Sequence, residues 1–197
     1  MKFDHTDAIV LTGGRGERMG GCDKGLVELC GKPLVQWVTD SIAPQVDKII
    51  ISANRNLEEY RALGFPVVID ELKDFQGPLA GIHSALKKTG NEFVLVVPTD
   101  SPGLPQDLCY KLGVALLESE AEIAVVETDG KVQPVLMLFR SALKPEFEKW
   151  MKQGSRKVID WINSRRHVAV SFPGDELLTV NINDSDNLAA ASEILCR

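Results

Sequence analysis

The sequence predicts an α/β fold with a mostly parallel central sheet and helices on both of its faces. Short, wholly apolar runs alternate along the chain with segments whose apolar residues recur every three or four positions. The runs are typical of strands buried on both faces, and the longer period is typical of amphipathic helices. Their alternation favours an α/β architecture. Because no linker, repeat or low-complexity stretch interrupts the pattern, we expect a single domain over residues 1–197.

Four apolar runs mark strands in the first half of the chain. These expected strands cover residues 8–11, 48–52, 67–69 and 93–97. One helix is expected to open at Pro33 and another at Pro78, because proline is favoured in the first helical turn. A third helix carries Leu108, Leu112 and Leu116 at four-residue spacing.

The second half of the chain is less regular. Strands are expected at residues 123–126, 135–139, 168–171 and 178–180. Helices are expected around residues 147–151, 158–162 and 188–195. Trp150 and Trp161 fall at helical spacing beside apolar neighbours, so we interpret both as core residues.

The composition excludes several classes of protein. The net charge is −6, from 22 Lys and Arg against 28 Asp and Glu, which argues against nucleic acid or a membrane surface as a partner. The start of the chain has no signal-peptide pattern, and no apolar run is long enough to span a bilayer. The cysteines do not form a C-x-x-C pair, and scattered thiols suit a reducing compartment. We therefore expect a cytoplasmic protein.

A glycine-rich loop follows the first strand. Residues 11–25 contain six glycines, whose backbone N–H groups can converge on an anion. Arg15, Arg18 and Lys24 add the positive charge that a triphosphate needs. The loop lacks the Gly-Lys-Ser/Thr of a P-loop, and Met19 stands where a dinucleotide fingerprint has its third glycine. A solvated surface loop is the alternative that these residues leave open.

Polar side chains follow the other strands of the first half. Asn54, Asp70 and Asp100 come after the second, third and fourth expected strands, and ligands of open α/β sheets bind beyond such carboxyl ends. The Asp100 carboxylate could hold Mg²⁺, which prefers oxygen ligands. Asn54 could bind ribose or base, and Asp70 could accept hydrogen bonds from guanine. All three residue types also suit turns or helix caps, so that reading stays open.

The motifs together carry a resemblance to a known family. The loop at residues 11–26, followed by residues 31–34, closely resembles the signature of the molybdenum cofactor guanylyltransferases. The similarity continues over nearly the whole chain, at residues 52–55, 70, 77–82, 98–102, 133–134, 154–158 and 181–183. Thr12 replaces a usual alanine and Thr99 a common cysteine. Both departures are small and affect none of the expected chemistry.

The resemblance implies a Rossmann-like nucleotidyltransferase fold and a Mg²⁺-dependent reaction. GMP would pass from GTP to the terminal phosphate of molybdopterin, giving the guanine dinucleotide form of the molybdenum cofactor and pyrophosphate. It implies catalytic roles for Arg18, Lys24 and Asp100, with the magnesium ion on Asp100. The nucleotide-binding residues that it implies are Leu11, Thr12, Gly13, Gly14, Lys24, Asn54, Asp70, Gly77 and Asp100. It also implies contacts with other proteins of the cofactor pathway or with chaperones of apo-molybdoenzymes.

A large pterin phosphate needs a second polar patch. The candidates are Arg156, Lys157, Asn181 and Asn183 from the irregular second half, although a solvated basic turn and two turn asparagines fit the same residues.

Three alternative functions remain. They are a cytidylyltransferase for the same pterin, a sugar-phosphate nucleotidyltransferase, and a cofactor-binding adaptor without catalysis. The Gly-x-Gly-Thr-Arg-Leu loop of the sugar enzymes is absent, and residues 77–82 favour the guanylyl family over the cytidylyl one. The presence of Asp100 and Lys24 argues against the adaptor.

Overall fold

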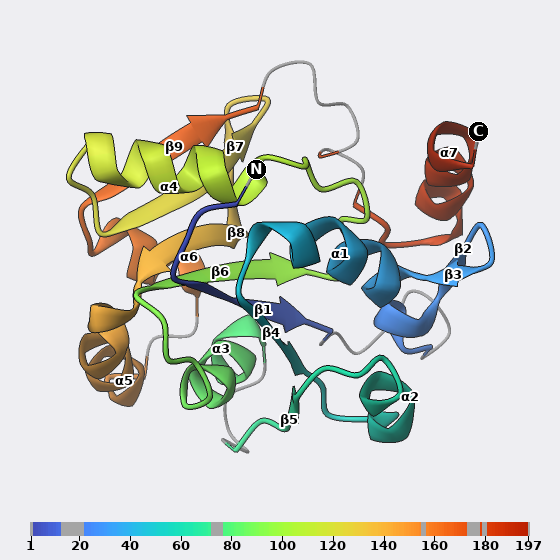
Figure 1. The fold of residues 1–197 in the computed structure, drawn as a ribbon, viewed down its shortest axis with the longest axis horizontal. Helices are drawn as coiled ribbons and strands as arrows, with labels where there is room; N and C mark the ends of the chain where they lie inside the picture. The colour runs from blue at the N-terminus through green and yellow to red at the C-terminus, as the bar shows by residue number, and fades with distance from the viewer. Residues whose placement is uncertain are drawn as a thin grey trace.

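A seven-stranded sheet forms the centre of the protein (Figure 1). The computed structural model describes residues 2–12, 22–71, 77–154, 157–172, 178 and 181–196. The strands, in sheet order, are β5 (Val67–Val68), β4 (Lys48–Ser52), β1 (Thr6–Leu11), β6 (Phe93–Pro98), β8 (Lys131–Arg140), β7 (Ile123–Thr128) and β9 (His167–Ser171). Every neighbouring pair is parallel except the two pairs that β8 makes with β6 and β7. The mostly parallel sheet predicted from the sequence is therefore confirmed.

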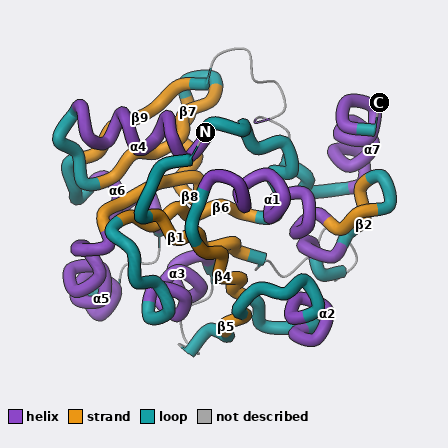
Figure 2. Tube along the Cα trace, viewed as in Figure 1, coloured by secondary structure: helices purple, strands orange, loops and turns teal. Residues whose placement is uncertain are grey.

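Helices surround the strands (Figure 2). They are α1 (Leu34–Ile42), α2 (Leu57–Arg61), α3 (Pro78–Leu86), α4 (Leu108–Glu118), α5 (Lys144–Lys152), α6 (Val158–Asn163) and α7 (Ser185–Leu195). None of the helices in these described segments is long and apolar enough to cross a membrane.

Both faces of the sheet are buried, which explains the wholly apolar strand sequences. Ala8 and Val10 of β1 pack in one cluster with α1, α2 and α4. Ile9 and Leu11 point to the opposite face and pack in a second cluster with α3, α5 and α6. Trp161 is fully buried in that second cluster, which confirms its assignment to the core.

Several element boundaries differ from the expectation. β5 has only two residues, and the side chain of Ile69, expected in that strand, is about half exposed (49%). Pro33 lies in a short strand, and α1 begins one residue later. Leu178 lies in a helical turn, so the strand expected there is wrong at that residue. Residues 179 and 180 are outside the described part of the chain. The short α2 was not expected, because five residues carry too little periodicity.

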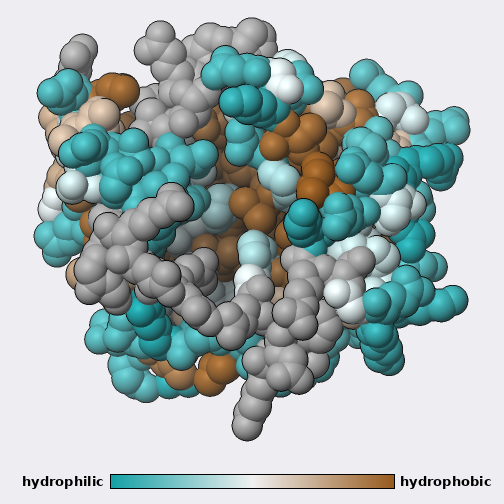
Figure 3. Space-filling model, turned by 180° about the vertical axis from the view of Figure 1, so that it is seen from behind, coloured by the Kyte–Doolittle hydropathy of each residue, from teal (hydrophilic) through white to brown (hydrophobic). Residues whose placement is uncertain are grey.

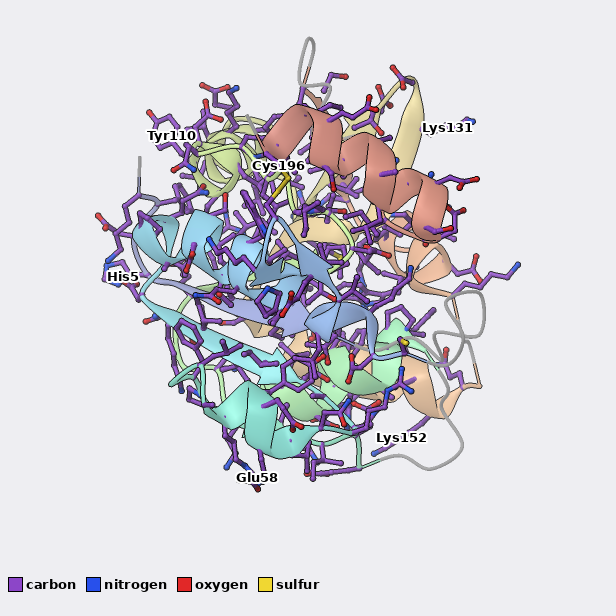
Figure 4. All side chains as sticks on the ribbon, turned by 90° about the vertical axis from the view of Figure 1, so that its right-hand side faces the viewer. His5, Glu58, Tyr110, Lys131, Lys152 and Cys196 are labelled. Carbon is purple, nitrogen blue, oxygen red and sulfur yellow. A yellow bond between two sulfur atoms is a disulfide. The ribbon has the colours of Figure 1, made fainter. Side chains whose placement is uncertain are left out.

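The C-terminal helix packs beside a small hairpin formed by β2 (Glu28–Leu29) and β3 (Lys32–Pro33). Leu29 and Leu34 form a third apolar cluster with Ile182 and Ala191. A disulfide between Cys30 and Cys196 joins the hairpin turn to the end of α7 (Figure 4).

The expectation of scattered thiols is therefore wrong for Cys30 and Cys196. Cys22 and Cys109 are free, the first exposed and the second buried. The bonded residues are separated by 166 positions, so only the packing of α7 brings them together. Because disulfides are uncommon in reducing compartments, the cytoplasmic location stays a prediction.

Reduction of this disulfide is expected to lower the free energy of unfolding by about 2–4 kcal/mol, because the bond closes a long loop of the unfolded chain. Urea unfolding with and without a thiol reductant measures the change. Cys22→Ser should respond to the reductant as the wild type does, whereas Cys30→Ser should not respond. Equal unfolding midpoints for the oxidised and reduced wild type would contradict the expectation.

Candidate active site

Four parallel strands end at one edge of the sheet. Leu11 at the end of β1 pairs with Ser52 of β4 and Pro98 of β6, and Ser52 pairs in turn with Val68 of β5. In Figure 1 the arrowheads of β1 and β6 point towards the side of the molecule where α7 and the β2–β3 hairpin lie. The polar residues that follow these four ends are Thr12, Asn54, Asp70 and Asp100. The structure thus brings together the strand ends that the sequence singled out.

Lys24 and Asp100 meet at this edge. The Lys24 ammonium lies 3.4 Å from Asp100 Oδ2 and donates a 2.6 Å hydrogen bond to Asn183 Oδ1. Both charged side chains are partly buried, with exposed fractions of 17% for Lys24 and 29% for Asp100. Because bulk water only partly surrounds the pair, its charges are screened less than those of a surface pair. The three side chains thus form a polar cluster that can contact an incoming anion and a cation.

The C-terminal segment completes this cluster. The Ile182 N–H donates to the Asp100 carbonyl at 2.9 Å, and the Ser101 hydroxyl donates to Asn181 Oδ1 at 2.8 Å. Asn181 therefore contacts Ser101, just beyond the end of β6, and Asn183 contacts Lys24. The sequence alone had only grouped these asparagines with the basic pair at 156–157. Lys157 lies exposed at the start of α6, and the described contacts include no hydrogen bond between it and either asparagine.

Asn54 and Asp70 bind each other reciprocally. The Asn54 amide donates to Asp70 Oδ2 at 2.8 Å, while the Asp70 backbone N–H donates to Asn54 Oδ1 at 2.9 Å. The Ser52 hydroxyl lies 3.3 Å from Asp70 Oδ1 and also donates to it. Each carboxylate oxygen of Asp70 keeps further lone-pair capacity. The pair is thus held at the ends of β4 and β5 with acceptors available to a ligand.

The ends of β1 and β4 also support helix α3. Gly77 precedes the helix with φ of 128°, a conformation that favours glycine. A Cβ on Gly81 would lie 2.6 Å from the Ser52 hydroxyl and 3.0 Å from a methyl carbon of Leu11. Glycine at residue 81 therefore allows α3 to approach the strand ends closely.

Asp23, which was not among the expected site residues, organises the start of the Lys24 segment. Its carboxylate accepts hydrogen bonds from Tyr60 and Asn56, more than thirty residues further along the chain. The sequence offered one local signal, since aspartate is a favoured residue before a helical turn, and Asp23 precedes the turn Lys24–Leu26. No local pattern links it to Tyr60.

Several predicted site residues lie outside the described part of the chain. They are Gly13, Gly14, Arg15, Arg18 and Arg156. Their roles, and those of the described site residues, stay predictions.

The face of the molecule opposite to the one seen in Figure 1 is hollowed near its centre, with hydrophobic residues at the bottom of the hollow (Figure 3). Concave, largely apolar surfaces with a few polar groups are typical of small-molecule sites.

The fold and the polar edge define an α/β protein with a ligand site beyond the carboxyl ends of its parallel strands, where ligands of such sheets bind. A family model described as "MobA-like NTP transferase domain" matches residues 8–169. The chain belongs to the MobA-like NTP transferase family. The resemblance drawn from the sequence motifs is thereby confirmed.

Named relatives cover almost the whole chain. The molybdenum cofactor guanylyltransferase of Shewanella putrefaciens is 41% identical over 179 residues, which are 91% of this chain and 92% of that protein. The crystal structure of molybdopterin-guanine dinucleotide biosynthesis protein A from Archaeoglobus fulgidus is 26% identical, with a TM-score of 0.77 over 95% of this chain and 97% of that one.

A more distant relative shows the fold alone. It is 2-C-methyl-D-erythritol 4-phosphate cytidylyltransferase from Thermus thermophilus, which is 14% identical with a TM-score of 0.71, each chain being fully covered. The Rossmann-like nucleotidyltransferase fold predicted from the sequence is therefore confirmed.

Proposed function

We propose that this protein transfers GMP from GTP to the terminal phosphate of molybdopterin, yielding the guanine dinucleotide cofactor and pyrophosphate. The observation that carries the proposal is the Lys24–Asp100–Asn183 cluster at the carboxyl edge of the parallel sheet. Its support comes from relatives named molybdenum cofactor guanylyltransferase, at about 40% identity over most of the chain.

The reaction requires two anions to meet. An oxygen of the acceptor's terminal phosphate bonds to the α-phosphorus of GTP, and the bond from that phosphorus to the bridging oxygen of the β-phosphate breaks. Pyrophosphate leaves with the bonding electron pair. The nucleophile is already ionised, so the enzyme needs no serine, cysteine or histidine nucleophile. Its contribution is positioning and charge stabilisation.

Lys24 would supply positive charge to the reacting phosphates. Its ammonium is placed by Asp100 and Asn183 at the sheet edge, where a triphosphate would lie beyond the strand ends. A fixed cation there reduces repulsion between the two substrates and stabilises the departing pyrophosphate. Arg18, which lies outside the described residues, is proposed to act in the same way.

The residues present also fit a magnesium ion. Among residues 2–12, 22–71, 77–154 and the described segments that follow, no group of three or more His, Cys, Asp or Glu could hold a metal ion by itself. Mg²⁺ suits such a site, because it commonly takes one or two carboxylates and completes its shell with phosphate oxygens and water. Asp100 would hold it, and the ion would neutralise charge on the phosphates.

Asn54 and Asp70 are proposed to bind the guanosine. The free lone pairs on Asp70 match the paired N–H donors of guanine, and the Asn54 contact keeps the carboxylate in place. Asn181, Asn183, Lys157 and Arg156 are proposed to bind the acceptor.

Pyrophosphate release tests the proposal. Purified protein is mixed with Mg²⁺, extracted molybdopterin and each of the four NTPs in turn. We expect release with GTP that depends on the acceptor and on Mg²⁺. A preference for CTP or UTP would overturn the guanylyl assignment, and no release with any nucleotide would overturn the catalytic function.

A further inference from the structure

The Asp23 carboxylate is buried beside the Lys24 cluster and is saturated by donors. Its side chain is only 5% exposed. Oδ1 accepts a 2.6 Å hydrogen bond from the Tyr60 hydroxyl and a 3.3 Å bond from the Gly25 N–H. Oδ2 accepts a 3.0 Å bond from the Asn56 amide and lies 3.5 Å from Arg55 Nε. All of these donors belong to the protein, so the carboxylate connects its own segment to the segment of residues 55–60.

Tyr60 gives this carboxylate a rigid support. The tyrosine lies on α2, is fully buried, and packs in the same core cluster as β1 and α1. Burial is the main cause that raises the pKa of Tyr60 above its ordinary value, and the hydrogen bond to Asp23 is the second cause. The hydroxyl therefore keeps its proton near neutral pH and acts as a donor.

Gly25 allows its own backbone to pack closely against this tyrosine. A Cβ at residue 25 would collide with the Tyr60 hydroxyl and lie 3.3 Å from two ring carbons. The segment 23–25 is thus docked on α2 by one hydrogen-bonded carboxylate and one close backbone approach. Arg55 adds a further tie, since its guanidinium donates to the Cys22 carbonyl at 3.0 Å.

Lys24 depends on this docking because its backbone is bonded directly to that of Asp23 and Gly25. Its long side chain has many rotamers, and the site needs the ammonium near Asp100 and Asn183. We propose that Asp23 and Tyr60 form a positioning pair that places Lys24 for phosphate binding and transfer. The pair touches no reacting atom and acts through Lys24. This role rests on the proposed function, which it extends to two further residues.

A double-mutant cycle tests the coupling. Tyr60→Phe removes only the hydroxyl, and Asp23→Asn keeps the side-chain shape. Each is expected to lower kcat for pyrophosphate release about 10–10²-fold, because small misplacements of reacting groups are costly. In a Lys24→Ala background the same substitutions should cost less than about twofold, because coupled residues are not additive. Full additivity with Lys24→Ala would overturn the proposal.

The chain offers matched controls. Tyr110 is the other of its two tyrosines, lies exposed on α4, and loses a hydroxyl in Tyr110→Phe. Asp107→Asn removes a carboxylate charge that pairs with Lys111 at the surface. Both controls should keep the wild-type kcat. If circular dichroism shows that Asp23→Asn does not fold, the cycle of Tyr60→Phe with Lys24→Ala still tests the proposal.

Chemical labelling of lysines gives a readout that does not depend on catalysis. We expect an amine-reactive ester to label Lys24 several-fold faster in Tyr60→Phe than in the wild type, while Lys131 at the surface stays unchanged. Unchanged Lys24 labelling would overturn the positioning role. If the wild type releases no pyrophosphate, the proposed function fails while the labelling experiment still decides whether the pair holds Lys24.

Discussion

Asp100→Ala is expected to lower the rate of pyrophosphate release about 10²–10³-fold, the usual cost of removing one electrostatic group from a reaction site. The substitution removes the carboxylate proposed to hold Mg²⁺, while the hydrogen bond from the Lys24 ammonium to Asn183 is kept. Turnover at saturating GTP and acceptor, measured over a range of Mg²⁺ concentrations, should become nearly independent of the metal.

The loss should be chemical and not structural. The Asp100 side chain is 29% exposed, and partly exposed ion pairs contribute at most about 1 kcal/mol, so circular dichroism and the unfolding midpoint should stay close to those of the wild type. Asp107→Ala, which removes a surface carboxylate outside the site, is the matched control. Near-native turnover by a folded Asp100→Ala protein would refute the metal assignment.

Lys24→Ala is expected both to weaken GTP binding and to slow transfer. The ammonium would contact the triphosphate in the bound state and meet additional negative charge as pyrophosphate leaves, so its removal affects both steps. We expect kcat to fall about 10²-fold and the dissociation constant for GTP to rise at least about tenfold, since hydrogen bonds to charged groups contribute about 1.5–3 kcal/mol. Calorimetric titration and steady-state kinetics measure the two effects separately.

Lys131→Ala serves as the matched control for this variant. Lys131 is the first residue of β8, next to the turn from β7, and is exposed, as Figure 4 shows, so its loss should change neither quantity. Identical GTP titrations and rates for Lys24→Ala and the wild type would show that this charge contributes nothing to the site.

Much of the architecture could be predicted because the apolar sequences of the strands indicate directly that both of their faces are buried. The four strands of the first half are apolar on both faces, which matches a parallel sheet covered by helices. The positions of Asn54, Asp70 and Asp100 then followed from the rule that parallel strands end at one edge. Their meeting at that edge is what the structure adds, through the pairing of Leu11 with Ser52 and Pro98.

The long-range contacts could not be predicted, because nothing local encodes them. The Asp23–Tyr60 hydrogen bond spans 37 positions, the Lys24–Asn183 bond 159, and the disulfide 166. Each depends on how α2 or α7 packs, and α2 itself is too short to leave a periodic signal. The antiparallel direction of β8 could not be predicted either, because an apolar run indicates a buried strand but not whether that strand is parallel or antiparallel to its neighbours.

A crystal of the protein grown with GTP and Mn²⁺ in place of Mg²⁺ would show whether the nucleotide and the metal bind at the sheet edge formed by Lys24 and Asp100. We expect triphosphate density beside the Lys24 ammonium and an anomalous manganese peak at the Asp100 carboxylate, with guanine near Asp70. Ordered nucleotide bound elsewhere, or a metal peak away from Asp100 with Lys24 still paired to that carboxylate, would contradict it.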